Sequence, residues 1–223
     1  MELQPQYPVR TRRLLLRPLA ADDTDALVAY RSQPEVCRFV PFEPMNAEAV
    51  GEKLHGGWSR TGIDDEGQAL TLGVELAETG QVVGDVMLAL HSTKDQGGEI
   101  GWVFHPDHAG HGYATEAAHA LLHLAFDELG LHRVVARVDA RNVASLRLAE
   151  RLGMRREAYL VGNEWFKSEW SDEIDFAILE EEWRARRPVG QHREEGSHHP
   201  ESCSRSAADP DAALAKECGC MRP

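Results

Sequence analysis

Long apolar runs are absent from this 223-residue sequence, and no stretch approaches the ~20 residues that a membrane-spanning helix needs. The early apolar stretch Leu14 to Leu16 is too short for the core of a secretory signal. Cysteine is scarce as well: Cys37 lies in the body of the chain, and the others, Cys203, Cys218 and Cys220, lie near its end. This is no disulfide framework. We therefore expect a cytoplasmic protein that does not bind membranes.

Basic residues are outnumbered, with 24 Lys and Arg against 37 Asp and Glu and a formal net charge of −13. This balance argues against broad nucleic-acid binding, because phosphate contacts need clustered Lys and Arg. An acidic surface instead attracts cationic partners such as amines, amino-sugars or basic polypeptides. Hydrophobic residues make up 42% of the chain, which is ordinary for a globular protein with a substantial core.

The composition changes near Arg187 and Pro188. Apolar residues recur periodically before this point, whereas Ser, His, Glu, Pro and Gly dominate after it. We predict one folded domain over residues 1–187 and a flexible, disordered tail over residues 188–223 that turnover does not need.

Periodicity and turn residues predict alternating strands and helices within the domain. This order indicates an α/β (α+β) fold with mixed strand pairing. The expected helices run from Asp22 to the residues before Pro34, and over Ala47–Leu54, Thr115–Leu129 and Ala144–Leu152. The expected strands are Arg13–Pro18, Leu70–Leu76, Val82–Leu90, Glu99–Phe104, Val134–Val138, Tyr159–Val161 and Ile174–Leu179.

A glycine-rich turn joins the strand Glu99–Phe104 to the long helix that follows it. Such a turn presents free backbone N–H groups at a helix N-terminus, which suits a pyrophosphate. Gly110 and Gly112 would allow close approach of the backbone. No Lys-Ser/Thr follows and the third glycine of a dinucleotide fingerprint is missing, so this is neither a P-loop nor a dinucleotide motif. On this evidence alone, two glycines that merely make a turn remain an equal alternative.

Three ordered blocks resemble the GNAT superfamily of acetyltransferases. Asp107 to Gly112 matches its Gln/Arg-x-x-Gly-x-Gly/Ala signature except at Asp107, and Tyr113 to Ala117 resembles the branch of ribosomal-protein N-terminal acetyltransferases. Asn142 to Met154 is similar to that branch's Asn-x-x-Ser…Leu-Gly-Phe motif, and Glu164 to Ala177 is similar to its closing hairpin. The resemblance covers roughly residues 9 to 183.

The resemblance implies a GNAT fold, with a mixed, mostly antiparallel central sheet and helices on both faces. It implies transfer of an acetyl group from acetyl-CoA to a primary amine, by direct attack in a ternary complex and without a metal. The acceptor would be a protein N-terminus, an amino-sugar, or a peptide or small-molecule amine, and the protein a monomer or homodimer. A strand bulge near Trp102 to Phe104 would expose backbone groups. The implied acetyl-CoA-binding residues are Val103, Phe104, Gly110, His111, Gly112, Tyr113, Ala114, Thr115 and Asn142.

The same resemblance suggests the catalytic groups. Many GNAT enzymes carry a tyrosine seven residues after the asparagine as the acid for the departing thiolate, but this chain has Ala149 there. In the ribosomal-protein branch, a serine that maps to Ser145 takes this role; the alternative is that Ser145 only caps its helix. The general base maps to Glu164, with a solvated surface charge as the alternative and Glu99 as the second candidate base.

The sequence also allows two other interpretations. His119 and His123 have the spacing of a zinc motif, but its middle glutamate is missing and both histidines lie on the polar face of the helix, so we expect no metal site. A non-catalytic acyl-CoA-binding module with a partner-binding tail is conceivable because the tyrosine is missing. The pair Ser145 and Glu164 argues against it.

Overall fold

Eight strands form one sheet within residues 1–186, the part of the chain that the computed structural model describes. The order is β1-β2-β3-β4-β5-β6-β8-β7, and every neighbouring pair is antiparallel except the parallel pair β5 and β6. The strands are β1 (Val9–Arg10), β2 (Leu14–Pro18), β3 (Ala69–Leu76), β4 (Val82–Ser92), β5 (Gly97–Phe104), β6 (Arg133–Asp139), β7 (Arg155–Phe166) and β8 (Glu169–Leu179).

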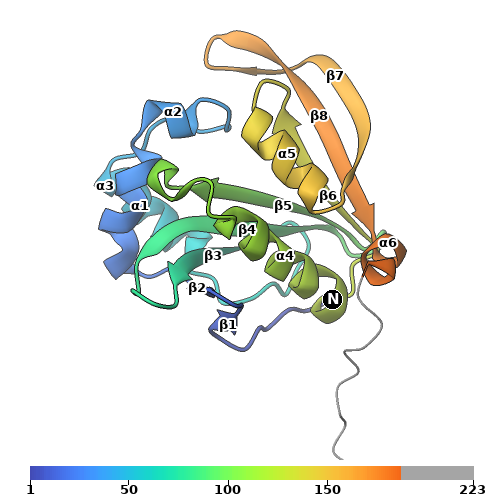
Figure 1. Ribbon diagram of the computed structural model, residues 1–223, viewed down its shortest axis with the longest axis horizontal. Helices are drawn as coiled ribbons and strands as arrows, with labels where there is room; N and C mark the ends of the chain where they lie inside the picture. The colour runs from blue at the N-terminus through green and yellow to red at the C-terminus, as the bar shows by residue number, and fades with distance from the viewer. Residues whose placement is uncertain (187–223) are drawn as a thin grey trace, which may run out of the picture. The chain divides into compact units, whose positions relative to one another are not determined.

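Helices and short helical turns connect these strands (Figure 1). They are α1 (Thr24–Arg31), α2 (Pro34–Cys37), α3 (Ala47–Lys53), α4 (Tyr113–His123), α5 (Val143–Arg151) and α6 (Glu180–Ala185). The 3-10 turns are η1 (Ala21–Asp23) and η3 (Pro106–His108), and the π-helical turns are η2 (Leu54–Trp58) and η4 (Leu124–Glu128).

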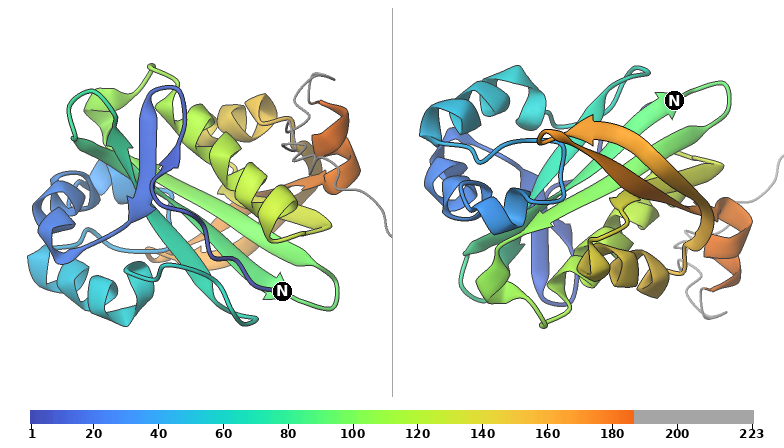
Figure 2. Two further views of the ribbon diagram at one scale, coloured as in Figure 1. Left: turned by 90° about the horizontal axis from the view of Figure 1, so that it is seen from below. Right: turned by 90° about the horizontal axis from the view of Figure 1, so that it is seen from above.

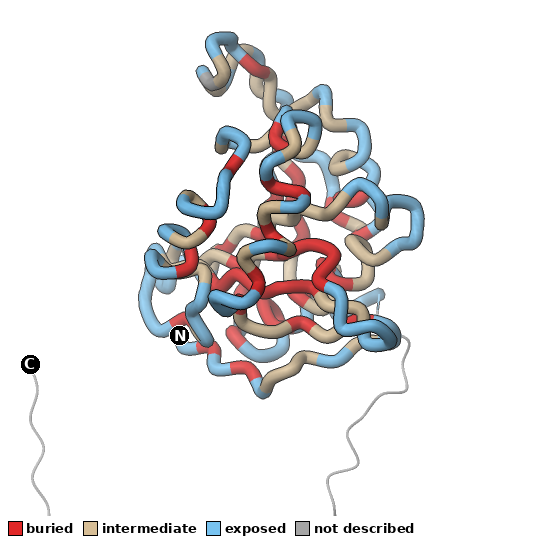
Figure 3. The backbone as a smooth tube through the Cα atoms, turned by 90° about the vertical axis from the view of Figure 1, so that its left-hand side faces the viewer, coloured by how far each residue is buried: buried red, intermediate tan, exposed pale blue. Residues whose placement is uncertain are grey.

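The two faces of the sheet are covered by different helices (Figure 2). On β4, Val86, Leu88 and Leu90 belong to the larger core cluster, which also contains the apolar side chains of α4 and α5. Asp85, the residue before Val86, faces the other way and accepts hydrogen bonds from residues of α1. Figure 3 shows the buried residues gathered in the middle of the domain. The expected mixed, mostly antiparallel sheet with helices on both faces is confirmed.

Strands β5 and β6 pair over a short length only. Gly97, Gly98 and Glu99 align with Arg133, Val134 and Val135, and no later residue of β5 pairs with β6 among the described residues. The two strands diverge from there (Figure 1). Residues 100–104 remain paired with β4 on their other edge. The divergence leaves one edge of β5 without a partner strand.

This arrangement corrects the bulge that we expected near Trp102 to Phe104. The pairing of β5 with β4 is regular there, with Trp102 opposite Val86 and Phe104 opposite Gly84, and its one irregularity lies between Leu90 and Ser92. The backbone edge is freed by separation of two strands and not by an inserted residue. Separation of two strands leaves the alternation of side chains along β5 unchanged, so the sequence pattern carries no sign of it.

Most predicted elements are present, with shifted boundaries. The helix expected over Thr115–Leu129 is α4 followed by the π-helical turn η4. The helix expected to end before Pro34 does so, because α1 ends at Arg31. Pro34 itself begins the short helix α2, which we did not expect; proline lacks only an N–H that the first turn does not use. The β7–β8 hairpin is much longer than the strands expected at Tyr159–Val161 and Ile174–Leu179. The prediction was too short because the outer half of the hairpin is polar and lacks an apolar alternation. Helix α6 was missed.

The predicted tail, residues 188–223, lies outside the described residues, so its character remains a prediction. Within the part of the chain that is described, no helix is both long and apolar enough to cross a bilayer.

A buried ion pair joins α1 to the sheet. The guanidinium of Arg31 donates to both carboxylate oxygens of Asp85, at 3.0 and 2.6 Å, and the Tyr30 hydroxyl donates to the same carboxylate at 2.6 Å. The side chains of Arg31 and Asp85 are each 4% exposed. The guanidinium also lies 4.3 Å from the centre of the Trp58 ring. This pair fixes where α1 lies on the sheet.

Asp85→Ala should lower the free energy of unfolding by about 3–5 kcal/mol, because it leaves the buried guanidinium of Arg31 without its counter-ion. Urea unfolding measures the loss. The double variant Arg31→Met with Asp85→Leu should recover a large part of it, since apolar side chains can replace a buried pair. Glu180→Ala, which breaks a surface pair with Arg184, is the control and should cost ~1 kcal/mol or less. A loss below about 1 kcal/mol for Asp85→Ala would show that the pair does not hold α1.

Candidate active site

The glycine-rich loop runs from the end of β5 through η3 to the start of α4. Gly110 and Gly112 have φ angles of +81° and +79°, in the left-handed region that strains other residues. The Glu116 N–H donates to the Gly112 carbonyl, so the N–H groups of residues 113–115 precede the hydrogen-bond ladder of the helix. These N–H groups and the helix dipole make a binding position for an anion.

An ion pair that sequence reasoning missed holds this loop against β2. Glu116 accepts from the Thr11 hydroxyl at 2.6 Å and from the backbone N–H of Arg13 at 2.8 Å, and it forms a salt bridge with the Arg13 guanidinium at 2.7 Å. Arg13 also donates to the His111 carbonyl at 2.9 Å. Burial opposes ionisation of Glu116, but the bonds from Thr11 and Arg13 outweigh it and lower its pKa. The loop is therefore fixed before any ligand binds.

A groove of about 1,040 Å³, here called the loop groove, lies along this loop. Every predicted acetyl-CoA-binding residue lines it except His111. The His111 ring stacks on Tyr113 instead, with the ring centres 5.4 Å apart. The predicted residues that line the loop groove are Val103, Phe104, Gly110, Gly112, Tyr113, Ala114, Thr115 and Asn142.

A second cavity of about 560 Å³, here called the acidic cavity, lies under the β7–β8 hairpin. Its walls come from the segment after α1, from β4 to β6 and from the hairpin. Carboxylates outnumber cationic groups among its lining side chains, so it favours a positively charged guest. Its charged lining residues are Asp85, Glu99, Asp139, Glu164, Asp172 and Glu173, with Arg31, Lys53 and Arg137.

The two cavities share part of their walls at the gap between β5 and β6. Trp102, Val103, Asn142 and Ser145 line both of them. The Trp102 indole N–H donates to the Ser145 hydroxyl oxygen at 3.1 Å, across the gap. A molecule in the loop groove therefore reaches the acidic cavity where this serine lies.

The structure separates the roles of Asn142 and Ser145. Asn142 is the N-cap of α5, and its side-chain oxygen accepts the Ser145 N–H at 3.2 Å. The alternative that the Ser145 side chain only caps the helix is therefore wrong. Its hydroxyl lies in the wall between the two cavities instead.

Three glutamates line the acidic cavity and differ in their partners. Glu99 forms a salt bridge with Arg137 at 2.5 Å, and its carboxylate lies 3.5 Å from Nε2 of His91. The Glu164 carboxylate forms no hydrogen bond or ion pair with the described residues, whereas its backbone carbonyl accepts from Ser171. The third, Glu173, was missed by sequence reasoning. Burial and the neighbouring Asp175 carboxylate raise the pKa of Glu173 above its ordinary value.

The histidines at i, i+4 on α4 contact other residues of the domain. His119 packs against the Trp183 ring, with the ring centres 4.7 Å apart, and His123 lies 3.6 Å from Asp127. Within residues 1–186, no group of three or more His, Cys, Asp or Glu side chains is arranged to hold a metal ion.

Comparison with known proteins agrees with this geometry. A family model described as an acetyltransferase (GNAT) domain matches residues 13–155. The chain is 35% identical over 183 residues to the uncharacterised N-acetyltransferase YnaD of Bacillus subtilis, and the alignment covers 78% of this chain and 98% of YnaD.

Solved structures show the same relationship. A GNAT-family acetyltransferase from Bacillus anthracis shares 31% identity with a TM-score of 0.69, over 81% of this chain and 99% of that one. A candidate ribosomal-protein-serine acetyltransferase from Vibrio cholerae shares 25% identity with a TM-score of 0.67, over 79% of this chain and 99% of that one. This chain therefore belongs to the GNAT family of acetyltransferases and is an acetyl-CoA-dependent N-acetyltransferase.

Proposed function

We propose that the protein transfers the acetyl group by direct attack of an amine on acetyl-CoA, with both molecules bound at once. One observation carries this proposal: the loop groove and the acidic cavity meet at Trp102, Val103, Asn142 and Ser145. A donor and an acceptor can then enter from separate sides with their reacting atoms together. Such positioning converts a reaction of two molecules into one within a complex.

The loop groove binds acetyl-CoA in this proposal. The N–H groups at the start of α4 hold the pyrophosphate, and the unpaired edge of β5 at Val103 and Phe104 faces the pantetheine arm. Asn142 binds the same arm from the other side of the gap. His111 contributes through its backbone alone, because its ring stacks on Tyr113 and does not line the groove.

Glu164 is the proposed general base. A cationic amine that enters the acidic cavity must lose a proton before its nitrogen can attack the thioester carbonyl. No described side chain engages the Glu164 carboxylate, whereas Glu99 is already bonded to Arg137. This difference favours Glu164 over Glu99.

Ser145 is the proposed proton donor to the departing thiolate. Its hydroxyl oxygen accepts the hydrogen of the Trp102 indole, so its own hydrogen is left to point elsewhere. When the C–S bond breaks, the sulfur takes a proton from this hydroxyl, and the serine oxygen regains a proton from solvent. The serine thus replaces the tyrosine that Ala149 cannot supply.

The acceptor is an amine in a cationic molecule: a protein N-terminus, an amino-sugar, or a peptide or small-molecule amine. The carboxylate excess of the acidic cavity supports this class. The likeness to the Vibrio cholerae protein favours a polypeptide N-terminus as the first acceptor to test.

Acetyl-CoA at ~100 times its dissociation constant should stabilise the fold by about 2.7 kcal/mol. For a domain of this size the melting temperature should then rise by about 5–10 °C. Gly112→Val should abolish the shift, because a β-branched residue is strained at φ +79° and its side chain would obstruct the phosphates. Gly130→Val is the matched control: Gly130 has φ +75° but lines neither cavity, so this variant should keep the shift. No shift in the unmodified protein would contradict donor binding.

Glu164→Gln should slow turnover near neutral pH by about a hundredfold or more, since positioned proton transfer typically contributes 10²- to 10⁴-fold. Thiol release from acetyl-CoA with a panel of amines measures it. Part of the loss should return at high pH, where free amine accumulates. Glu99→Gln and Glu173→Gln are the rival variants, and a large loss in either with a normal Glu164→Gln would move the base to that residue.

Ser145→Ala should lower the rate at every pH, because protonation of the thiolate does not depend on the charge of the amine. The expected pH profile is parallel to that of the unmodified enzyme. A profile that recovers at high pH, as expected for Glu164→Gln, would contradict the assignment of Ser145 as proton donor.

A further inference from the structure

Strand β7 carries a bulge immediately before Glu164. Leu160 is opposite Glu173 on β8, and Glu164 is opposite Ser171, so the three residues 161–163 stand opposite Asp172 alone. Such a bulge re-aims the side chains that follow it. The direction of Glu164 therefore depends on how the bulge is held.

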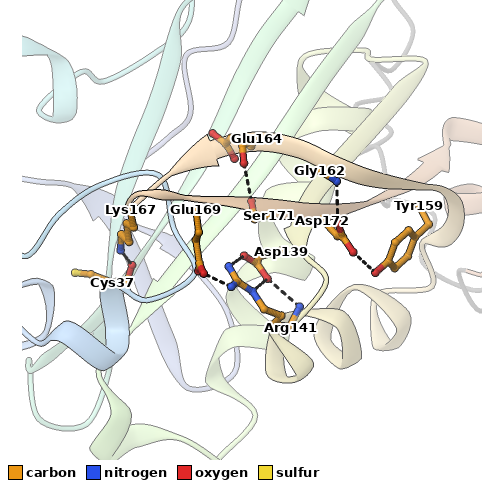
Figure 4. Close-up of polar contacts among 10 residues, drawn as sticks. All are labelled: Cys37, Asp139, Arg141, Tyr159, Gly162, Glu164, Lys167, Glu169, Ser171 and Asp172. Atoms are coloured by element: carbon orange, nitrogen blue, oxygen red, sulfur yellow. Dashed lines mark hydrogen bonds and ion pairs between the residues drawn. The ribbon is translucent and has the colours of Figure 1, made fainter.

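The carboxylate of Asp172 holds this bulge with both of its oxygens (Figure 4). One oxygen accepts the backbone N–H of Gly162 at 2.8 Å, and the other accepts the hydroxyl of Tyr159 at 2.5 Å. Gly162 has φ +57°, so the bulge depends on a left-handed residue fixed by this bond. The bonds from Tyr159 and Gly162 lower the pKa of Asp172 below its ordinary value, which keeps it an acceptor at neutral pH.

The backbone of Asp172 connects the hairpin to the other half of the site. Its carbonyl accepts the N–H of Ala140 at 2.9 Å, at the end of β6 and two residues before Asn142. The neighbouring Ser171 hydroxyl bonds to the Glu164 carbonyl at 3.3 Å. The position of Glu164 is thereby set relative to the loop that carries Asn142 and Ser145.

We propose that Asp172 is a positioning residue for Glu164, which it holds toward the acceptor amine by accepting one hydrogen bond from Gly162 in the β7 bulge and one from Tyr159 just before the bulge. This inference rests on the proposed function, in which Glu164 is the base. Both oxygens of Asp172 are engaged, so it acts through geometry and takes no proton itself.

Two variants at this position separate geometry from charge. Asp172→Ala removes both acceptors and should lower kcat by about tenfold or more, equivalent to ~1.4 kcal/mol of barrier, with the acetyl-CoA thermal shift unchanged. Asp172→Asn keeps an acceptor for the Gly162 N–H. Its amide N–H can donate to the Tyr159 oxygen, which replaces the hydrogen bond that Tyr159 donates to the carboxylate. The asparagine should therefore recover most of the loss. Val161→Ala is the control in the same bulge, since Val161 is 80% exposed and lines neither cavity.

A double-mutant cycle tests whether Asp172 acts through Glu164. Asp172→Ala introduced into Glu164→Gln should cost less than about threefold in kcat, because a base that is already absent cannot be misplaced. Full additivity of the two losses would overturn the proposal. Equal losses in Asp172→Ala and Asp172→Asn would overturn it too, since charge and not geometry would then matter.

The exchange rate of the Gly162 amide hydrogen, measured by NMR, tests the hydrogen bond from Gly162 to Asp172 without any amine substrate. It should rise about tenfold or more in Asp172→Ala and stay near the original value in Asp172→Asn. Unchanged exchange in Asp172→Ala would show that the carboxylate does not hold the bulge.

Turnover separates this inference from the proposed function. If Glu164→Gln turns over normally, the assignment of Glu164 as the base fails. If Glu164→Gln is slow and Asp172→Ala has a normal rate, only the positioning role of Asp172 is overturned.

Discussion

The separation of β5 from β6 is the constraint on which the site depends. The strands pair in parallel over three residues and then diverge, so no strand among residues 1–186 pairs with this edge of β5 from residue 100 onward. A sheet that stayed closed would leave no path between its two faces. Here the loop groove and the acidic cavity share Trp102 and Ser145 at this gap, and the indole N–H of Trp102 spans it to the serine hydroxyl.

The β7–β8 hairpin completes the acidic cavity, and polar contacts hold its tip on two sides (Figure 4). The Lys167 ammonium group donates to the carbonyl of Cys37 at the end of α2. On the other side Arg141 joins the Glu169 carboxylate to Asp139 at the end of β6. The first 60 residues and the last strands, distant in sequence, thus enclose one cavity. Its carboxylates come from β4, β5, β6 and the hairpin, and the first 60 residues contribute Arg31 and Lys53.

The loop groove and the acidic cavity differ in the kind of group that forms them. The loop groove includes the N–H groups of a helix start, two left-handed glycines and a free strand edge. The acidic cavity is lined by side chains whose directions depend on a bulge, on ion pairs and on the packing of α1. The glycine-rich loop is therefore visible in the sequence, whereas the arrangement of the acidic cavity is not.

The sequence by itself determined the family, because three ordered blocks resemble its motifs, and the order of most elements, because apolar periodicity and turn residues mark helices and strands. It also named Ser145 and Glu164, through their resemblance to family motifs. Only the tertiary structure decided that β5 is freed by divergence and not by a bulge, that Asn142 and not Ser145 caps α5, and that Asp172 faces Gly162 and Tyr159. These features depend on which strands lie next to each other and in which register, and a shift of register moves every later side chain without any change in the local sequence pattern.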